Sequence, residues 1–196
     1  MALPEQPAER HRVVAGTFSD RVRGVSPEGW DAPAPVTGWT ARDVIDHLGW
    51  FSGYLSGSYG LVMPAGPSPA EDPAGAWRTQ SDAVQAVLDD PAQAERTVDD
   101  PHMGSIPLRD LVDRIYTADV FMHTWDLARA TGQDDRLDPD FCAELLAGME
   151  GIEEVLRASG QYGPAVPVPD DADVQTRMLG FIGRDPEWKP PGRSGL

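Results

Sequence analysis

Proline and glycine gather in four stretches of this 196-residue chain, and this clustering constrains its fold more than any other feature of the sequence. Both residues end or interrupt helices, proline because it lacks a backbone N–H and glycine because of its conformational freedom. The pattern therefore predicts helices separated by loops rather than a chain that is disordered throughout. The four stretches cover residues 27–38, 64–75, 160–170 and 183–195.

Apolar residues recur between these stretches at spacings of three and four, as they do on the buried face of a helix. Thr40 and Asp43 form a helix start similar to a capping box. Pro107 suits the first turn of a helix, and Gly132 suits its end. A short extended segment is expected over 97–106. The predicted helices span residues 5–24, 41–62, 71–88, 107–132, 140–159 and 173–182.

Four main helices joined by loops of about ten residues are typical of an antiparallel bundle. We therefore predict an all-α fold, an antiparallel four-helix bundle with extra short helices. The length fits a single domain over residues 1–196, because a chain of this size can bury a substantial core. The tail over 183–196 is expected to be irregular.

Asp and Glu outnumber Lys and Arg, which gives the chain a formal net charge of −16. Such a surface repels phosphate backbones and anionic lipids, so nucleic acids and membranes are not expected partners. No apolar run approaches the ~18–20 residues that span a bilayer, and the N-terminal residues do not resemble a secretory signal. The single cysteine, Cys142, allows no internal disulfide. These features predict a cytoplasmic protein.

Three ionisable residues of the helix predicted over 107–132 fall on its apolar face. On a wheel of about 100° per residue, Asp119, His123 and Asp126 lie within about 60° of the centre of the buried stripe. Ionised groups on such a face are costly unless they are paired or bind a metal. The opposite face is expected to lie in solvent. It carries Asp110, Asp113, Arg114, Thr117 and Thr124.

Asp119 and His123 are four residues apart, so their side chains meet on one face of the helix and are close enough to share an ion. His47 lies on the inward flank of the second predicted helix. Together the three form a set of two histidines and one carboxylate, which suits Zn²⁺, Fe²⁺, Ni²⁺ or Mn²⁺ and leaves coordination positions open. Asp43 and Asp126 are expected to orient the imidazole N–H groups.

The same residues allow an interpretation without a metal. An aspartate and a histidine four residues apart also form a buried ion pair, and a single histidine on an apolar face is more often a hydrogen-bonded core residue. Trp39, Trp50 and Trp125 are expected to line the core or a pocket beside the site. Phe121 projects from the predicted polar face and is a candidate homodimer contact.

Two motifs stand out in the sequence, residues 38–48 (GWTARDVIDHL) and residues 119–132 (DVFMHTWDLARATG). They resemble the signatures of the DinB-like superfamily, in the branch of mycothiol-dependent maleylpyruvate isomerase-type proteins of actinobacteria. Further similarity lies in residues 163–169 and 183–186, so the resemblance covers nearly the whole chain. It implies a four-helix bundle that holds a divalent metal, usually zinc, between its helices.

The resemblance places the metal ligands at His47, Asp119 and His123, the set that the helix faces also favour. Characterised enzymes of the family use the metal to activate a low-molecular-weight thiol, which adds to an electrophile in an isomerisation or S-transfer. The resemblance therefore implies a mycothiol-dependent enzyme that acts on a small electrophilic substrate. The isomerase itself has a glutamate where this chain has Asp119, so the hypothesis here is thiol chemistry on a substrate other than maleylpyruvate.

Two other functions stay open from the sequence. One is metal-assisted hydrolysis or cyclisation without a thiol, and the other is a metal-binding module without catalytic activity that acts in a stress response. The acidic surface disfavours an acidic substrate unless Arg114, Arg129 or Arg184 turns into the site. The sequence identifies no catalytic residue.

Overall fold

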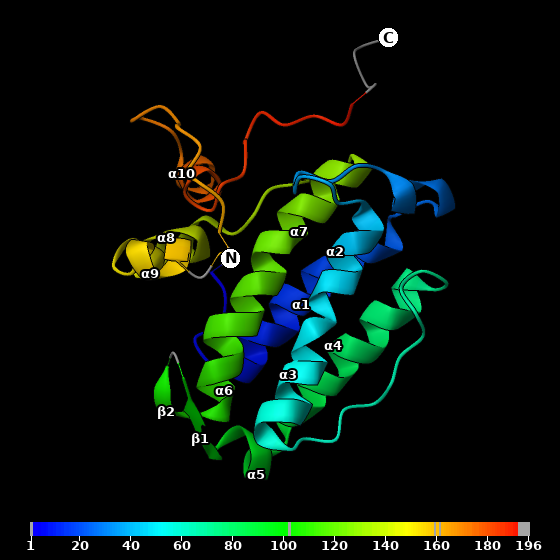
Figure 1. Cartoon of the computed structure of the whole chain (residues 1–196), viewed down its shortest axis with the longest axis vertical. Helices are drawn as coiled ribbons and strands as arrows, with labels where there is room; N and C mark the ends of the chain where they lie inside the picture. Colours follow the sequence, from blue (N-terminus) through cyan, green and yellow to red (C-terminus); the bar gives the residue numbers. More distant parts are fainter. Residues whose placement is uncertain (1, 102, 159, 161, 192–196) are drawn as a thin grey trace.

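The computed structural model describes residues 2–101, 103–158, 160 and 162–191. Helices dominate this part of the chain, and two short strands pair as a hairpin (Figure 1). The prediction of an all-α class is confirmed, and the helical architecture is compatible with the expected DinB-like fold. The elements are α1 (Pro7–Arg23), the 3-10 helix η1 (Pro27–Asp31), α2 (Ala41–Leu48), α3 (Trp50–Tyr59), α4 (Pro73–Asp89), α5 (Pro91–Ala94), β1 (Thr97–Asp100), β2 (Gly104–Pro107), α6 (Leu108–Leu111), the π-helical turn η2 (Val112–Thr117), α7 (Ala118–Thr131), α8 (Pro139–Glu150), α9 (Glu153–Ala158) and α10 (Val174–Phe181).

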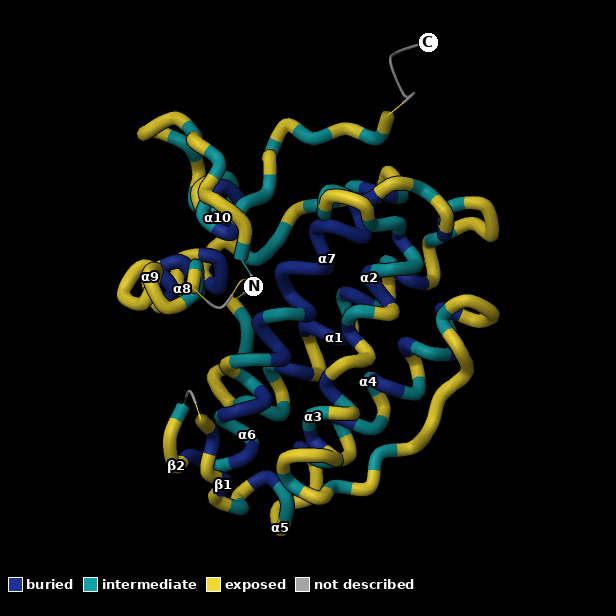
Figure 2. The backbone as a smooth tube through the Cα atoms, in the orientation of Figure 1, coloured by how far each residue is buried: buried dark blue, intermediate teal, exposed yellow. Residues whose placement is uncertain are grey.

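Many apolar core residues lie on α1, α2, α4 and α7, which pack against one another. α1 packs against α4 and α7, and α2 packs against the same two helices. α8, α9 and α10 lie together beside α7, on the side away from α2 (Figure 1). α7 is therefore covered on both sides, and Figure 2 shows almost its whole length as buried.

The helix predicted over 41–62 is divided into α2 and α3, which meet at Gly49. At this joint the hydroxyl of Tyr116 donates a hydrogen bond of 3.1 Å to the carbonyl oxygen of Leu48. The contact ties the joint to the π-helical turn before α7. His47 lies in the last turn of α2, directly before the residue that accepts this hydrogen bond.

The helix predicted over 107–132 contains one wide turn. Residues 112–117 form the π-helical turn η2 between α6 and α7. A π turn closes its hydrogen bonds over five residues instead of four, so a wheel of uniform pitch fails across it. The relative spacing of Asp119, His123 and Asp126 is unaffected, because all three follow the turn.

The polar face predicted for this helix is only partly exposed. Arg114 is exposed and Asp110 and Asp113 are half-buried, but Thr117 and Thr124 are buried. The hydroxyl of Thr117 contacts His11 of α1, and the buried hydroxyl of Thr124 bonds to a backbone carbonyl of its own helix. Phe121 is 5% exposed and packs edge-on against Phe141 of α8, with ring centroids 4.7 Å apart. The prediction that Phe121 marks a homodimer contact is therefore wrong.

The segment expected to be extended forms the hairpin of β1 and β2, in which Val98 pairs with Ile106. The buried carboxylate of Asp100, at the end of β1, accepts hydrogen bonds from the hydroxyls of Tyr54 and Tyr59. Both tyrosines belong to α3. These contacts fasten the hairpin to the rest of the protein.

The two helices predicted near the C-terminus are present, the first divided into α8 and α9 and the second as α10. In the described part of the tail, residues 183–191, there is no helix or strand. Residue 159 of the first predicted helix and residues 192–196 of the tail lie outside the described residues. Within the described ranges no helix has the length and apolar character needed to cross a membrane.

His11 of α1 is fully buried, and its Nδ1 atom lies 2.9 Å from the hydroxyl oxygen of Thr117. Burial, and after it the charge of Arg12, lowers the pKa of His11 from 6.5 to about 4. The imidazole is therefore neutral in the folded protein at neutral pH. In the unfolded chain its pKa returns to the ordinary value, so the unfolded state binds more protons between these two values.

This difference predicts a loss of stability in acid. The contribution of the neutral imidazole is fully present above pH 6.5 and falls as the pH drops toward about 4. Between pH 7 and pH 5 we expect the wild-type free energy of unfolding to fall by about 2 kcal/mol more than that of His11→Gln. Urea unfolding at the two pH values measures this difference, and equal losses in the two proteins would contradict the prediction.

Candidate metal centre

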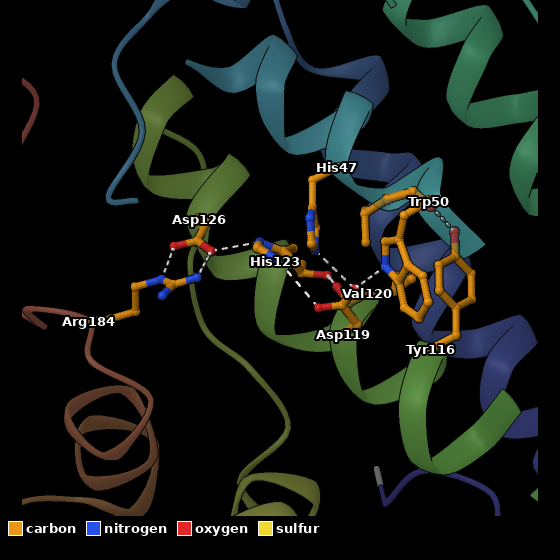
Figure 3. Close-up of polar contacts among 10 residues, drawn as sticks. His47, Trp50, Tyr116, Asp119, Val120, His123, Asp126 and Arg184 are labelled. Atoms are coloured by element: carbon orange, nitrogen blue, oxygen red, sulfur yellow. Dashed lines mark hydrogen bonds and ion pairs between the residues drawn. The ribbon is translucent and has the colours of Figure 1, made fainter. Parts of the chain in front are cut away.

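The structure brings His47, Asp119 and His123 together where α2 packs against α7. One donor atom from each residue lies within 4.8 Å of the other two. The Nε2 atom of His47 lies 3.2 Å from Oδ2 of Asp119, and the Nε2 atom of His123 lies 3.4 Å from Oδ1 (Figure 3). Two imidazoles therefore face the two oxygens of one carboxylate.

The three side chains differ in their access to solvent. That of His123 is 7% exposed, that of Asp119 is 19% exposed, and that of His47 is 33% exposed. The cluster thus has a closed side at His123 and a more open side at His47. Three protein donors with one open side match the arrangement of catalytic rather than structural metal sites.

Asp126 lies one turn after His123 on α7, with a side chain only 1% exposed. Its Oδ2 atom accepts a hydrogen bond of 2.8 Å from Nδ1 of His123. The guanidinium of Arg184, which comes from the segment after α10, donates to both oxygens of the same carboxylate (Figure 3). The nitrogen of His123 that faces away from Asp119 is therefore held by a fixed acceptor.

Two tryptophans also contact the cluster. The indole N–H of Trp50, in the first turn of α3, donates a hydrogen bond of 3.1 Å to Oδ2 of Asp119. The ring of Trp39 lies 5.0 Å from that of His47 and is stacked at 5.7 Å on that of His123. Trp50 therefore orients the carboxylate, and Trp39 covers one side of both imidazoles.

Two other predicted residues have different neighbours. Both the backbone N–H and the hydroxyl of Thr40 donate to Oδ2 of Asp43, which completes the capping box of α2. Trp125 is fully buried, with the guanidinium of Arg129 over its ring at 5.2 Å. Among the described residues, no hydrogen bond or ring contact joins Asp43 or Trp125 to the three candidate ligands. A role for either residue at the site stays a prediction.

The charges of the cluster compensate one another. Burial alone would raise the pKa of Asp119, but the imidazoles of His123 and His47 lower it below its ordinary value. Burial alone would lower the pKa of His123, but the carboxylates of Asp119 and Asp126 raise it to about 9. Against the effect of burial, Arg184 and His123 lower the pKa of Asp126. Each buried charge therefore has a partner of opposite sign.

The donor set fits a divalent transition metal. Imidazole nitrogen with carboxylate oxygen suits zinc, iron, nickel or manganese. A ligating imidazole must give up its proton at the coordinating nitrogen and normally donates its other N–H to an acceptor. His123 meets the second condition through Asp126, and its Nε2 atom is the one that faces the cluster.

The model of the mycothiol maleylpyruvate isomerase N-terminal domain matches residues 11–128, which is more than half of the chain. The chain belongs to this family. Two uncharacterized proteins of Mycobacterium tuberculosis, from strains CDC 1551 and H37Rv, are each 26% identical to it over 186 residues. The alignment covers 91% of this chain and 97% of either relative. No solved structure matches the chain.

Membership of the mycothiol maleylpyruvate isomerase N-terminal domain family confirms the resemblance seen in the two sequence motifs. The matched range contains His47, Asp119 and His123 and also Asp126. Arg184 lies beyond its last residue. Arg184, which binds the carboxylate of Asp126, therefore comes from outside the range that the family model matches.

The contacts of Trp50 with Asp119 and of Arg184 with Asp126 were not predicted from the sequence. Trp50 follows His47 by three residues, so the two side chains share a helix face, and this spacing was an available signal. Arg184 was noticed only in the motif over 183–186 and as a candidate for binding an acidic substrate. Its pairing with Asp126 could not be predicted, because 58 residues separate the two and no periodic pattern joins them.

The hydrogen bond of Trp50 leads to a testable prediction. In Trp50→Phe the aromatic packing on Phe51 and Tyr54 remains, but Asp119 loses a donor. We expect the affinity for Co²⁺ or Zn²⁺ to fall about 2- to 10-fold, as for the loss of one hydrogen bond at a partly exposed group. Competition with a chromophoric chelator measures the affinity.

A matched control is Trp77→Phe. The indole of Trp77 is buried and donates to the hydroxyl of Ser19, which is not one of the residues that contact the cluster. This variant makes the same chemical change and should lose stability while it keeps the wild-type metal affinity. An unchanged affinity in Trp50→Phe, or an equal loss in both variants, would contradict the assignment.

Proposed function

We propose that this protein is a divalent-metal-dependent enzyme that uses mycothiol to attack a small electrophilic substrate, in an S-transfer or an isomerisation. His47, Asp119 and His123 hold the metal. Zinc is the proposed ion, and nickel, iron and manganese suit the same donors. The observation that carries the proposal is the convergence of these three donors, with an open side, in a chain of the mycothiol maleylpyruvate isomerase N-terminal domain family.

The chemistry that such an ion supplies, when bound, is to keep a coordinated thiol deprotonated at neutral pH and thereby nucleophilic. The protein side chains provide the geometry. Asp126 fixes the imidazole of His123 through Nδ1, and Trp50 fixes the carboxylate of Asp119. The buried side of the cluster, at His123, excludes water, so the thiol and its electrophile approach from the side of His47.

The proposed electrophile is uncharged. Arg184 lies at the site, but its guanidinium already donates hydrogen bonds to both oxygens of Asp126. Arg129 donates to backbone carbonyls of residues 186 and 188, and Arg114 is exposed on η2. Arg184 and Arg129 are thus already paired with other groups of the chain and are not available to an anionic group at the cluster. The net charge of −16 also repels anionic substrates.

The thiol of the chain itself does not compete with mycothiol in this proposal. Cys142 is buried on α8, and burial raises the pKa of its thiol to about 12. A thiol with such a pKa stays protonated at neutral pH and is a poor nucleophile. A sulfur signal at the metal would therefore come from an added thiol.

Optical spectroscopy of the Co²⁺-loaded protein tests the proposal. Addition of mycothiol is expected to produce a sulfur-to-cobalt charge-transfer band, because the thiolate becomes a ligand. S-methylated mycothiol, which cannot form a thiolate, should produce no such band. The His123→Ala variant should fail to bind Co²⁺ and give no band with either compound.

The alternatives are separated by the same titration. If Co²⁺ binds but mycothiol leaves the spectrum unchanged, thiol chemistry is excluded and metal-assisted hydrolysis or cyclisation becomes the better hypothesis. If Co²⁺ binds in a closed site whose spectrum no small ligand changes, a metal-binding module without catalysis is favoured. Either result contradicts the function proposed here.

A further inference from the structure

We propose that Arg184 is a positioning residue of the metal centre, and that it acts by holding Asp126 against His123. The inference rests on the proposed function only in its assignment of His123 as a metal ligand. It adds a residue from the C-terminal segment, outside the family match over residues 11–128, to the machinery of the site.

Contacts with Arg184 and His123 hold the carboxylate of Asp126 in one orientation. Arg184 donates from Nε to Oδ1 at 2.9 Å and from Nη2 to Oδ2 at 3.0 Å, which is a two-point pairing of guanidinium and carboxylate. Oδ2 also lies 2.8 Å from Nδ1 of His123. Rotation of the carboxylate would therefore break the contacts with both partners. Because the carboxylate of Asp126 is buried, water offers little replacement for these contacts.

The orientation of Asp126 determines which nitrogen of His123 faces the cluster. An imidazole that gives its Nδ1–H to a fixed carboxylate presents the lone pair of Nε2 to a metal. Nε2 is the atom that lies 3.4 Å from Asp119. The row of contacts thus runs from Arg184 through Asp126 to the coordinating atom of His123.

The backbone around Gly183 has a fixed conformation, which directs the side chain of Arg184 toward α7. Gly183 has a φ of +81°, in the left-handed region that glycine adopts without strain. A Cβ atom at this position would lie 3.0 Å from the carbonyl oxygen of Pro164 and 3.2 Å from Gly163, so a larger residue would not fit without a shift. The backbone N–H of Arg184 then bonds to the carbonyl oxygen of Leu179, at 2.9 Å. The side chain therefore leaves from a fixed point at the end of α10.

A second arginine fastens the same segment to α7 without touching Asp126. Arg129 donates to the carbonyl oxygen of Pro186 at 2.8 Å and to that of Trp188 at 3.5 Å. This contact provides a matched control, because its loss loosens the segment while it leaves the pairing of Arg184 with Asp126 in place.

The experiment measures the affinity of the metal alone, Co²⁺, by competition with a chromophoric chelator. In Arg184→Gln we expect the affinity to fall about 10- to 100-fold, the usual effect of removing a group that orients a ligand. In Arg184→Lys the fall should be smaller, because an ammonium keeps the charge but cannot pair with both oxygens in the same way. In Arg129→Gln the affinity should remain that of the wild type.

A double-mutant cycle tests whether Arg184 acts through Asp126. Asp126→Asn should itself weaken Co²⁺ binding, and Arg184→Gln should then add little further loss in the Asp126→Asn background. Circular dichroism establishes that each variant is folded. If Arg184→Gln does not fold, the same cycle is measured with Arg184→Lys, Asp126→Asn and the variant that combines them.

Three results would overturn the inference. The first is wild-type affinity in Arg184→Gln, and the second is an equal loss in Arg129→Gln, which would assign the effect to docking of the whole segment. The third is an undiminished loss in the Asp126→Asn background. Failure of the proposed function gives a different result. A wild-type protein that binds Co²⁺ but not mycothiol would contradict the proposed function without changing the effect of Arg184→Gln on Co²⁺ affinity. A wild-type protein that binds no Co²⁺ would overturn both.

Discussion

The burial of ionised groups on α7 is the constraint on which the rest of the structure depends. Asp119, His123 and Asp126 lie on one helix, α7, and most of the other residues of this helix are apolar and buried. Buried charges are costly unless opposite charges and hydrogen bonds compensate them, and even compensated pairs add little net stability. Arg184 and His47 supply that compensation from other elements. Because stability alone does not explain such an arrangement, a bound ligand is the better reason for it.

Two irregularities in the helices place the cluster. The joint between α2 and α3 follows His47 by two residues, and the π-helical turn ends two residues before Asp119. The hydrogen bond from Tyr116, in the π turn, to the carbonyl oxygen of Leu48, at the joint, links these two points directly. It fixes the distance between the two helices that carry the ligands. π turns occur frequently at functional sites, and here the turn precedes the candidate carboxylate ligand.

The sequence was sufficient for most features that depend on local spacing, although it did not predict the joint at Gly49 or the π-helical turn over 112–117. The helices, the capping box at Thr40 and the pairing of Asp119 with His123 all follow from neighbours within four residues. Apart from the convergence of His47 with Asp119 and His123, contacts between distant segments did not follow. The exposed positions expected for Thr117, Thr124 and Phe121 were wrong, because α1 and α8 cover a surface that the pattern of this helix alone leaves to solvent.

The same reason explains why the contact of Arg184 with Asp126 was not predicted. The tail that carries Arg184 has no periodic pattern, and the pairing depends on the path of the chain after α10. The candidate ligands could be predicted because helix faces are a local property. Of the residues that orient them, Asp126 was predicted because it shares a helix with His123.

Metal content tests the central claim most directly. We would measure it by mass spectrometry on untagged protein for the wild type, His47→Ala and His11→Gln, the last as a control that changes a histidine outside the cluster. The metal-centre hypothesis predicts one divalent ion per chain in the wild type and in His11→Gln, and none in His47→Ala. A wild-type protein without metal after reconstitution, or a tightly bound ion retained in His47→Ala, would contradict it and leave the cluster as a buried ion pair.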